Sequence, residues 1–303
     1  MIQEVLTGLS LSPSNFQIVK SAKNDVGSYS KKHNLNLILW PYKVPPGKYD
    51  VGVVVSFGQL IPGQSIDACA NGILNAHASL LPKLRGAAPI FRAILNDYNE
   101  TGVTIMRIKA DNFDVGDTVL QERVRIDEDT KSIDLHNKLA RLSASLLMKC
   151  LHDLDHYLGN AVKQNEQEAT KALRIKPEES RIRWPEMELK HVYKLYRAFD
   201  EFFAIYTTWI DKRELKLFKM VPYSRMVELQ DEINGEIAKR TQPGTVWYLK
   251  RKKLFCVKCK DQWAGFGEVC LKGHPRTSAK QFNNGHLQKL MSRSEDLLVL
   301  GSD

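Results

Sequence analysis

The pattern of apolar and polar positions divides this chain of 303 residues into two regions of different periodicity. Residues 51–56 are apolar without alternation, which is typical of a strand covered on both faces of a parallel sheet, so we expect a central strand there. Residues 72–75 and 102–108 are further strand candidates, and the alternation over 119–126 indicates an edge strand. Pro89 suits the first position of a helix, because that position needs no backbone N–H.

Between residues 132 and 158 the apolar positions recur at spacings of four and three, which predicts an amphipathic helix that packs on the sheet. Its apolar positions are Leu135, Leu139, Leu142 and Leu146. A polar segment rich in Gln, Glu and Lys follows over residues 160–190, and its composition is typical of an extended linker. We therefore predict an α/β domain over 1–159, a linker over 160–190 and a second domain over 191–303.

The second domain begins with a helical face formed by Val192, Tyr193, Tyr196 and Phe199. Five short strand-like runs follow, with turn residues between them: 204–210, 215–218, 245–249, 254–257 and 268–271. Five short strands of this kind predict a small β-barrel of the oligonucleotide-binding (OB) type.

Composition and charge narrow the class of protein. No apolar run approaches the roughly 20 residues that cross a bilayer, and the first residues do not form a secretory signal, so we expect a soluble intracellular protein without a membrane partner. The net charge is +9, and residues 191–303 carry 20 basic but only 13 acidic side chains. Such an excess favours a polyphosphate partner, although it is also compatible with a merely solvated surface.

The five cysteines do not form a disulfide framework in a chain of this length, and we expect them to be reduced. Cys256 and Cys259 have the spacing of half a zinc site, but no second Cys or His pair follows at a suitable distance. The alternation around them predicts a strand, so we interpret both as structural and expect no metal.

Candidate chemistry is concentrated in a loop that follows the strand at 72–75. Asn75, His77 and Ser79 place an amide, an imidazole and a hydroxyl within five residues, and Asp114 lies in a Gly-bearing turn further on. An imidazole can move a proton, a carboxylate can orient it, and an amide N–H can stabilise a developing oxyanion. Ligands of open α/β sheets collect at the carboxyl ends of the strands, where this loop and the turn at 57–62 are expected. The combination indicates acyl transfer between nitrogen atoms.

The motifs Asn-x-His-x-Ser-Leu-Leu-Pro (75–82), Arg-Gly-x-x-Pro (85–89), Thr-Gly-Val-Thr-Ile-Met (101–106) and Asp-x-Gly-Asp (114–117) resemble those of the methionyl-tRNA formyltransferases. The Phe-Asp-Val-Gly form of the acidic turn is most similar to the mitochondrial enzymes of eukaryotes. The resemblance implies a Rossmann-like formyltransferase domain with a mostly parallel sheet, followed by a basic OB-like domain that holds tRNA. It also implies transfer of a formyl group from the co-substrate 10-formyltetrahydrofolate to methionyl-initiator tRNA, in the mitochondrial matrix, by a monomer.

Carried over residue by residue, the resemblance assigns catalysis to Asn75, His77 and Asp114. Asn75 and a protonated His77 would offset charge on the formyl oxygen, and Asp114 would hold His77 in the required tautomer. Asp117 is interpreted as a turn residue that caps or binds backbone.

The resemblance places the folate on two segments and the tRNA on two others. The folate residues are Phe57, Gly58, Gln59, Leu60, Ser79, Leu80, Leu81 and Pro82. For the tRNA we expect Lys250, Arg251, Lys252 and Lys253, the densest basic cluster, together with Arg85. Arg85 has two interpretations that the sequence leaves open, because it either orients the loop or meets the tRNA end.

The chain departs from the family pattern at its beginning. Members of the family begin with a central strand and a Gly-Thr turn, whereas residues 1–12 have the pattern of a following helix, with Val5, Leu6 and Leu9 on one face. We therefore expect a domain truncated at its N-terminus. Two other functions stay open: a formyltransferase or hydrolase that uses the same folate on another substrate, and a tRNA-binding remnant without turnover.

Overall fold

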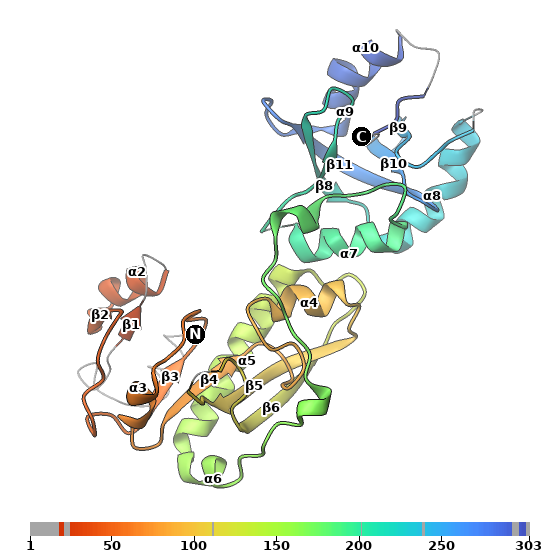
Figure 1. The fold of residues 1–303 in the computed structure, drawn as a ribbon. Helices are drawn as coiled ribbons and strands as arrows, with labels where there is room; N and C mark the ends of the chain where they lie inside the picture. The colour runs from red at the N-terminus through yellow and green to blue at the C-terminus, as the bar shows by residue number, and fades with distance from the viewer. Residues whose placement is uncertain are drawn as a thin grey trace. The chain divides into compact units, whose positions relative to one another are not determined.

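The structure is a computed structural model that describes residues 18–20, 25–110, 112–200, 202–237, 240–292 and 297–300. Residues 1–12, for which we predicted the end of a helix, lie outside these ranges. The chain separates into two compact units, which are treated individually below (Figure 1). Unit 1 comprises residues 1–127 and 134–174, and unit 2 comprises 128–133 and 175–303.

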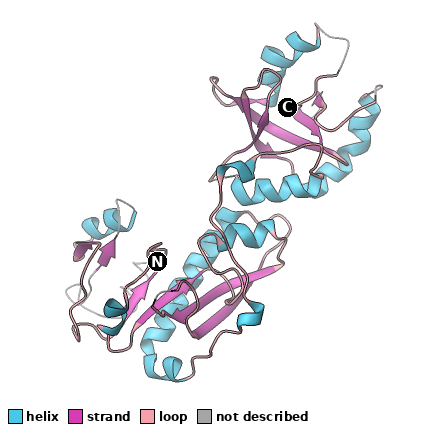
Figure 2. Ribbon diagram, viewed as in Figure 1, coloured by secondary structure: helices cyan, strands magenta, loops and turns pink. Residues whose placement is uncertain are grey.

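Unit 1 contains a four-stranded sheet with the order β3-β4-β5-β6, together with a separate parallel pair, β1 and β2 (Figure 2). The strands are β1 (Ile18–Lys20), β2 (Leu37–Leu39), β3 (Gly52–Val54), β4 (Ile73–His77), β5 (Glu100–Arg107) and β6 (Thr118–Arg125). The helices of this unit are α2 (Asp25–Lys32), α3 (Gly63–Asp67), α4 (Pro89–Leu95), α5 (Ser132–His152) and α6 (Leu154–Gly159).

The sheet is mixed, so the prediction of a mostly parallel sheet is wrong. Strand β3 runs parallel to β4, but β4 with β5 and β5 with β6 are antiparallel. The six central residues of β5 are all buried, although both of its neighbours run antiparallel to it. A continuous apolar run reports burial on both faces of a strand, and not the direction of its neighbours.

Strand β3 was predicted to be central, but it lies at an edge of the described four-stranded sheet. Its middle residue, Val53, is 42% exposed. The edge assignment of the strand at 119–126 is confirmed by β6, which pairs only with β5 in the described sheet.

The predicted helix over 132–158 is confirmed in position but consists of two helices. In α5 the side chains of Leu135, Leu139 and Leu146 are buried. Asp153 then leaves helical geometry, with φ −138° and ψ 59°, and α6 begins after it. Helix α4 starts at Pro89, as its first-turn chemistry predicts.

Unit 2 is built on an antiparallel sheet with the order β7-β8-β11-β10-β9, to which β12 adds on β11. Its strands are β7 (Ile205–Thr208), β8 (Glu214–Met220), β9 (Val246–Leu249), β10 (Leu254–Lys258), β11 (Trp263–Leu271) and β12 (Thr277–Ser278). The five predicted strands are confirmed. Within the described part of the chain no pairing joins β7 to β9, so the sheet is open in its hydrogen bonding.

The helices of unit 2 are α7 (Leu189–Phe199), α8 (Tyr223–Glu236), α9 (Ala279–Phe282), the π-helical turn η4 (Asn283–Leu287) and α10 (Gln288–Met291). The helical face predicted at 192–199 is confirmed by α7, whose side chains Val192, Tyr193, Tyr196 and Phe199 are buried. We did not predict α8. Over the described residues, no helix has the length and apolarity that a membrane span requires.

Residues 128–133 belong to unit 2, although they come from the connection after β6 and the first two residues of α5. The Tyr193 hydroxyl donates to Asp129 at 2.6 Å, and the Lys131 ammonium pairs with Asp200 at 2.6 Å. Burial and the hydrogen bond to Asp129 raise the pKa of Tyr193. This short segment therefore supplies polar partners to the face of α7.

The division between the units falls at residues 174 and 175, within the segment 160–190 for which we predicted a linker. Residues 160–174 belong to unit 1, and the 3₁₀ turns η2 (Glu166–Glu168) and η3 (Pro177–Ser180) give the segment local structure. Ala172 within it is fully buried. The polar composition reflects hydrogen bonding to another loop, described below, rather than a free connector.

Cys256 and Cys259 are fully buried in unit 2. Burial raises the pKa of the Cys256 thiol to about 12, and it also raises that of Cys259. Their structural interpretation is supported, because a protonated thiol inside a sheet packs as a small apolar group. The described residues contain no cluster of His, Cys, Asp and Glu suited to a metal ion.

Candidate active site

Strand β4 delivers two of the predicted catalytic residues. Asn75 and His77 are two positions apart on this strand, so their side chains leave the same face of the sheet. His77 is buried and Asn75 is half-buried. No described residue hydrogen bonds to the Asn75 side chain, which leaves its amide available for a ligand.

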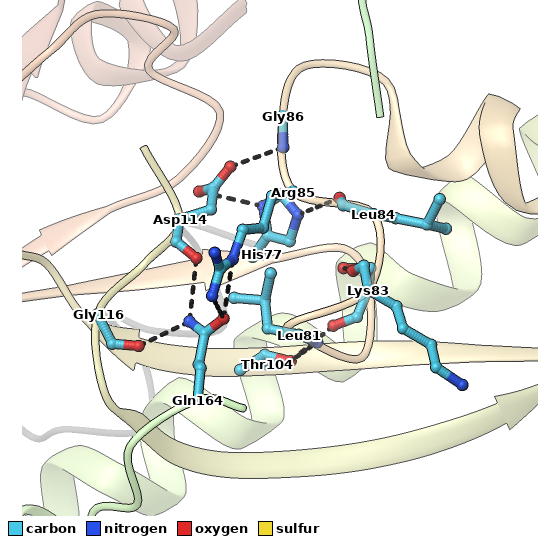
Figure 3. A network of polar contacts seen from close by, with 11 residues as sticks. His77, Leu81, Lys83, Leu84, Arg85, Gly86, Thr104, Asp114, Gly116 and Gln164 are labelled. Atoms are coloured by element: carbon cyan, nitrogen blue, oxygen red, sulfur yellow. Dashed lines mark hydrogen bonds and ion pairs between the residues drawn. The ribbon is translucent and has the colours of Figure 1, made fainter. Parts of the chain in front are cut away.

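His77 and Asp114 form a pair, although they lie far apart in the sequence (Figure 3). His77 Nδ1 is 3.5 Å from Asp114 Oδ1, and the two side chains are 8% and 12% exposed. The second ring nitrogen, Nε2, is 3.0 Å from the carbonyl oxygen of Leu84. The structure thus brings together two of the three predicted catalytic side chains in one buried contact.

Both ring nitrogens of His77 face acceptor oxygens, the Leu84 carbonyl and the Asp114 carboxylate. A neutral ring carries one N–H and can donate to Leu84 or to Asp114, but not to both. A charged ring donates to both.

Asp114 lies in a tight turn with an unusual backbone conformation. Its φ is +58°, a left-handed conformation that Asp tolerates better than most residues. The Gly86 N–H donates to Asp114 Oδ2 at 2.8 Å and fixes the carboxylate from the other side. Two positions on, Gly116 packs directly on the Arg107 carbonyl oxygen, which a Cβ at this position would overlap. The turn therefore requires glycine at 116.

Asp117 does not join the pair with His77. Its carboxylate accepts from Lys109 Nζ at 2.8 Å and is about one third exposed. It acts as a surface turn residue, beside the buried Asp114.

The loop after β4 is held by its own polar groups. The Ser79 hydroxyl donates to the Lys83 carbonyl at 2.7 Å. Thr104 on β5 donates to the Ser79 carbonyl and accepts from the Leu81 N–H, and Gln121 on β6 donates to the Leu81 carbonyl. The polar groups of Ser79 and Leu81 are thus used within the chain. Of the predicted folate residues in this loop, Leu80 and Pro82 are half-buried.

The other predicted folate segment, residues 57–60, differs from this loop in that its backbone polar groups are not used within the described part of the chain. No hydrogen bond from a described residue joins the backbone of these four residues, and Gly58, Gln59 and Leu60 are exposed. Gly58 has φ +69° with open space where a Cβ would stand. Phe57 packs on the apolar cluster around Ile61 and stacks edge-on with Trp40 at 5.1 Å. The segment follows β3, which is parallel to β4, so both leave the same edge of the sheet.

Arg85 is engaged inside unit 1. Its guanidinium donates to Gln164 Oε1 at 3.1 and 2.7 Å and to both carboxylate oxygens of Glu166 at 2.8 Å (Figure 3 shows the Gln164 contacts). The hydrogen bond to Glu166 raises the pKa of Arg85 and lowers that of Glu166. Of the two sequence interpretations, orientation of the loop is the one these contacts support.

Sequence reasoning missed a strap that holds the loop, formed by residues 164–172. Thr170 and Ala172 exchange backbone hydrogen bonds with Pro82, Arg85 and Ala88, and the Thr170 hydroxyl accepts from the Leu84 N–H. Gln164 reaches the Asp114 turn. The sequence offers as a signal only a small residue, Ala172, within a polar run, and the structure shows that this residue is fully buried.

The four predicted tRNA residues of unit 2 form the turn between β9 and β10. Lys250, Arg251, Lys252 and Lys253 are all exposed, and no described acidic side chain pairs with them. We call these residues the basic turn.

Two family models match the chain. The model described as formyl transferase matches residues 42–151, and that described as formyl transferase, C-terminal domain, matches 174–287. The first range contains the His77 and Asp114 pair, and the second contains the basic turn. The chain thus contains both domains that the formyl transferase family models describe.

Individual relatives specify the family further. The mitochondrial methionyl-tRNA formyltransferase of Bos taurus is 37% identical over 86% of this chain and 65% of that protein. The mitochondrial enzyme of Mus musculus is 33% identical over 94% of this chain and 70% of its own length. This chain belongs to the methionyl-tRNA formyltransferase family. It spans about two thirds of the length of these relatives.

Solved structures support the fold alone. An N-formyltransferase from Helicobacter canadensis, in complex with folinic acid and dTDP-3-aminofucose, gives a TM-score of 0.63 at 16% identity, over 88% of this chain and 93% of that one. HypX from Aquifex aeolicus in complex with tetrahydrofolic acid gives 0.61 at 15% identity, over 89% and 47%.

Proposed function

We propose that this chain transfers the formyl group of 10-formyltetrahydrofolate to the α-amino group of methionyl-initiator tRNA. The observation that carries the proposal is the buried His77 and Asp114 pair, together with the Asn75 amide on the same strand, which has no hydrogen-bond partner among the described residues. It lies within the region that matches the formyl transferase model.

The chemistry follows from these groups. The α-amino nitrogen forms a bond to the formyl carbon, and negative charge develops on the formyl oxygen. The Asn75 amide and the protonated His77 donate to that oxygen, and one preorganised donor of this type lowers the barrier by about 3 to 4 kcal/mol. The bond from the formyl carbon to the folate N10 then breaks, and a proton passes from the attacking amine to N10.

His77 must exchange one partner to act in this way. Its Nδ1 stays with Asp114, while Nε2 releases the Leu84 carbonyl and turns its N–H to the formyl oxygen. Asp114 keeps the ring oriented and stabilises its charge through this change.

For the folate, the segment 57–60 supplies the polar contacts, because its backbone N–H and C=O groups have no partner among the described residues. The loop 79–82 contributes an apolar wall through Leu80, Leu81 and Pro82, with Ser79 fixing its shape. A few polar groups on an apolar wall are what a flat pterin ring requires.

For the tRNA, the basic turn contacts phosphates, and the sheet of unit 2 serves as an OB-like platform. Arg85 contributes by holding the loop that faces the acceptor end. The enzyme acts as a monomer in the mitochondrial matrix, which gel filtration with light scattering and localisation of a tagged full-length chain would test.

The test is formylation of methionyl-initiator tRNA by the purified chain, with 10-formyltetrahydrofolate as donor. Formyl-methionyl-tRNA that disappears with His77→Ala supports the proposal. Formylation of a small amine instead, or release of formate without transfer to tRNA, would assign another folate-dependent transferase or hydrolase. Binding of tRNA without any turnover would assign a tRNA-binding remnant.

A further inference from the structure

Gln164 is a buried polar residue whose contacts the function proposed above does not use. It is 6% exposed and lies in the strap formed by residues 164–172. Its Nε2 donates to the Asp114 carbonyl at 3.0 Å and to the Gly116 carbonyl at 2.6 Å. Its Oε1 accepts two hydrogen bonds from Arg85. One side chain therefore joins the acidic turn to the loop after β4.

The orientation of this amide is fixed by its neighbours. Two carbonyl oxygens face the NH₂ group, and a guanidinium faces the oxygen. A flipped amide would set oxygen against two carbonyls and NH₂ against the cation, so only one orientation satisfies all the partners. Both donors and the acceptor are used in it.

These contacts close a ring around Asp114 (Figure 3). On one side its carboxylate accepts from the Gly86 N–H. Arg85, the preceding residue, donates to Gln164, and Gln164 donates back to the Asp114 carbonyl. The backbone and the side chain of Asp114 are thus held by adjoining parts of one network. His77 meets the carboxylate that this ring positions.

We propose that Gln164 is a positioning residue for the Asp114 and His77 pair. It holds the left-handed Asp114 so that Oδ1 faces His77 Nδ1 and Oδ2 faces Gly86. Arg85 and Glu166 extend this hold to the loop. The kinetic part of this inference rests on the proposed formyl transfer, whereas its structural part stands without it.

The substitution Gln164→Met keeps the length and volume of the side chain and removes all four hydrogen bonds. We expect kcat for formylation to fall about 10- to 100-fold, since small displacements of a catalytic group cost rates of this size. The KM for tRNA and for the folate should stay within about 2-fold. Gln167→Met, at an exposed position in the same segment, is the matched control and should leave kcat and the two KM values unchanged.

Non-additivity separates positioning from general support of the fold. If Gln164 acts through Asp114, Gln164→Met should lower kcat no further in a chain that already carries Asp114→Asn. Independent losses that multiply in the double variant would overturn the inference. If Gln164→Met does not fold, Gln164→Glu keeps the contact with Arg85 but sets an oxygen against the two carbonyls. Wild-type kcat in Gln164→Glu would equally overturn it.

A second readout does not depend on catalysis. Hydrogen exchange of the Gly86 amide, which donates to Asp114, should accelerate in Gln164→Met about as much as in Asp114→Asn, and not in Gln167→Met. Unchanged protection would refute the structural part even if the wild-type chain forms no product. A wild-type chain without formylation but with accelerated exchange in Gln164→Met would refute the proposed function alone.

Discussion

Replacing Asp114 with asparagine tests the central electrostatic contact of the site. The substitution keeps the shape of the side chain but leaves one acceptor oxygen in place of two, so that when this oxygen faces the His77 ring the amide NH₂ faces the Gly86 N–H. It removes the negative charge 3.5 Å from His77 Nδ1. Two unit charges at this separation interact by about 5 kcal/mol at an effective dielectric constant of about 20.

The rate effect should be smaller than this figure, because the amide of asparagine can still offer its oxygen to the ring. Removal of one preorganised electrostatic contact costs about 3 to 4 kcal/mol, and each 1.4 kcal/mol is a factor of ten in rate. We therefore expect kcat for formylation of methionyl-tRNA to fall about 10²- to 10³-fold. Affinity for tRNA, measured by filter binding, should change less than 2-fold.

The matched control is Asp117→Asn, which removes a carboxylate from the same turn. Asp117 pairs with Lys109 near the surface and does not contact His77, so kcat should stay within about 3-fold. Both variants should keep the wild-type melting temperature within a few degrees. The reasoning fails if Asp114→Asn retains wild-type turnover, or if Asp117→Asn loses as much.

Three further predictions concern the basic turn, the thiols and one glycine. Neutralising one lysine of the basic turn (residues 250–253) should lower the slope of the logarithm of the tRNA binding constant against the logarithm of the salt concentration by about one unit. An unchanged slope would show that this turn does not contact the tRNA. Burial raises the pKa of Cys256 to about 12, so a disulfide reagent at pH 8 should label this thiol only after unfolding. The partly exposed Cys270 should react in the native chain. Rapid labelling of Cys256 in the native chain would contradict its burial. In Gly116→Ala the added Cβ would overlap a backbone carbonyl oxygen. The free energy of unfolding in urea titrations should fall by about 1 to 3 kcal/mol, and turnover should be impaired. A wild-type midpoint of urea unfolding would show that the turn can relax.

The spacing of apolar residues predicted those helices and strands that bury one face and expose the other. The five strands of unit 2 and helix α7 follow from alternation and from a buried face of Val192, Tyr193 and Tyr196. Strand direction did not follow, because the buried β5 has the same apolar pattern in a parallel or an antiparallel sheet. Helix α8 was missed although Met226, Leu229 and Ile233 lie at helical spacing, since most of its remaining positions are polar.

The site was predictable in part from short motifs. Asn75 and His77 lie two residues apart, and a strand then fixes their common face. Asp114 was grouped with His77 by chemical type, and the family resemblance assigned the two to one site; no local pattern brings residues 37 positions apart together. Gln164 could not be found in this way. A polar residue in a polar segment looks solvated until the fold shows which carbonyls it binds.

The discontinuity of unit 2 has a practical consequence for exchange of parts between relatives. A fragment that begins at residue 175 would leave behind residues 128–133. The hydroxyl of Tyr193 and the carboxylate of Asp200 would then lose the partners described above. Any chimera that transplants unit 2 should therefore include residues 128–133 as well. A chimera joined at a single position would otherwise be destabilised by the loss of these contacts. Its low activity could then be mistaken for a functional mismatch between the two units.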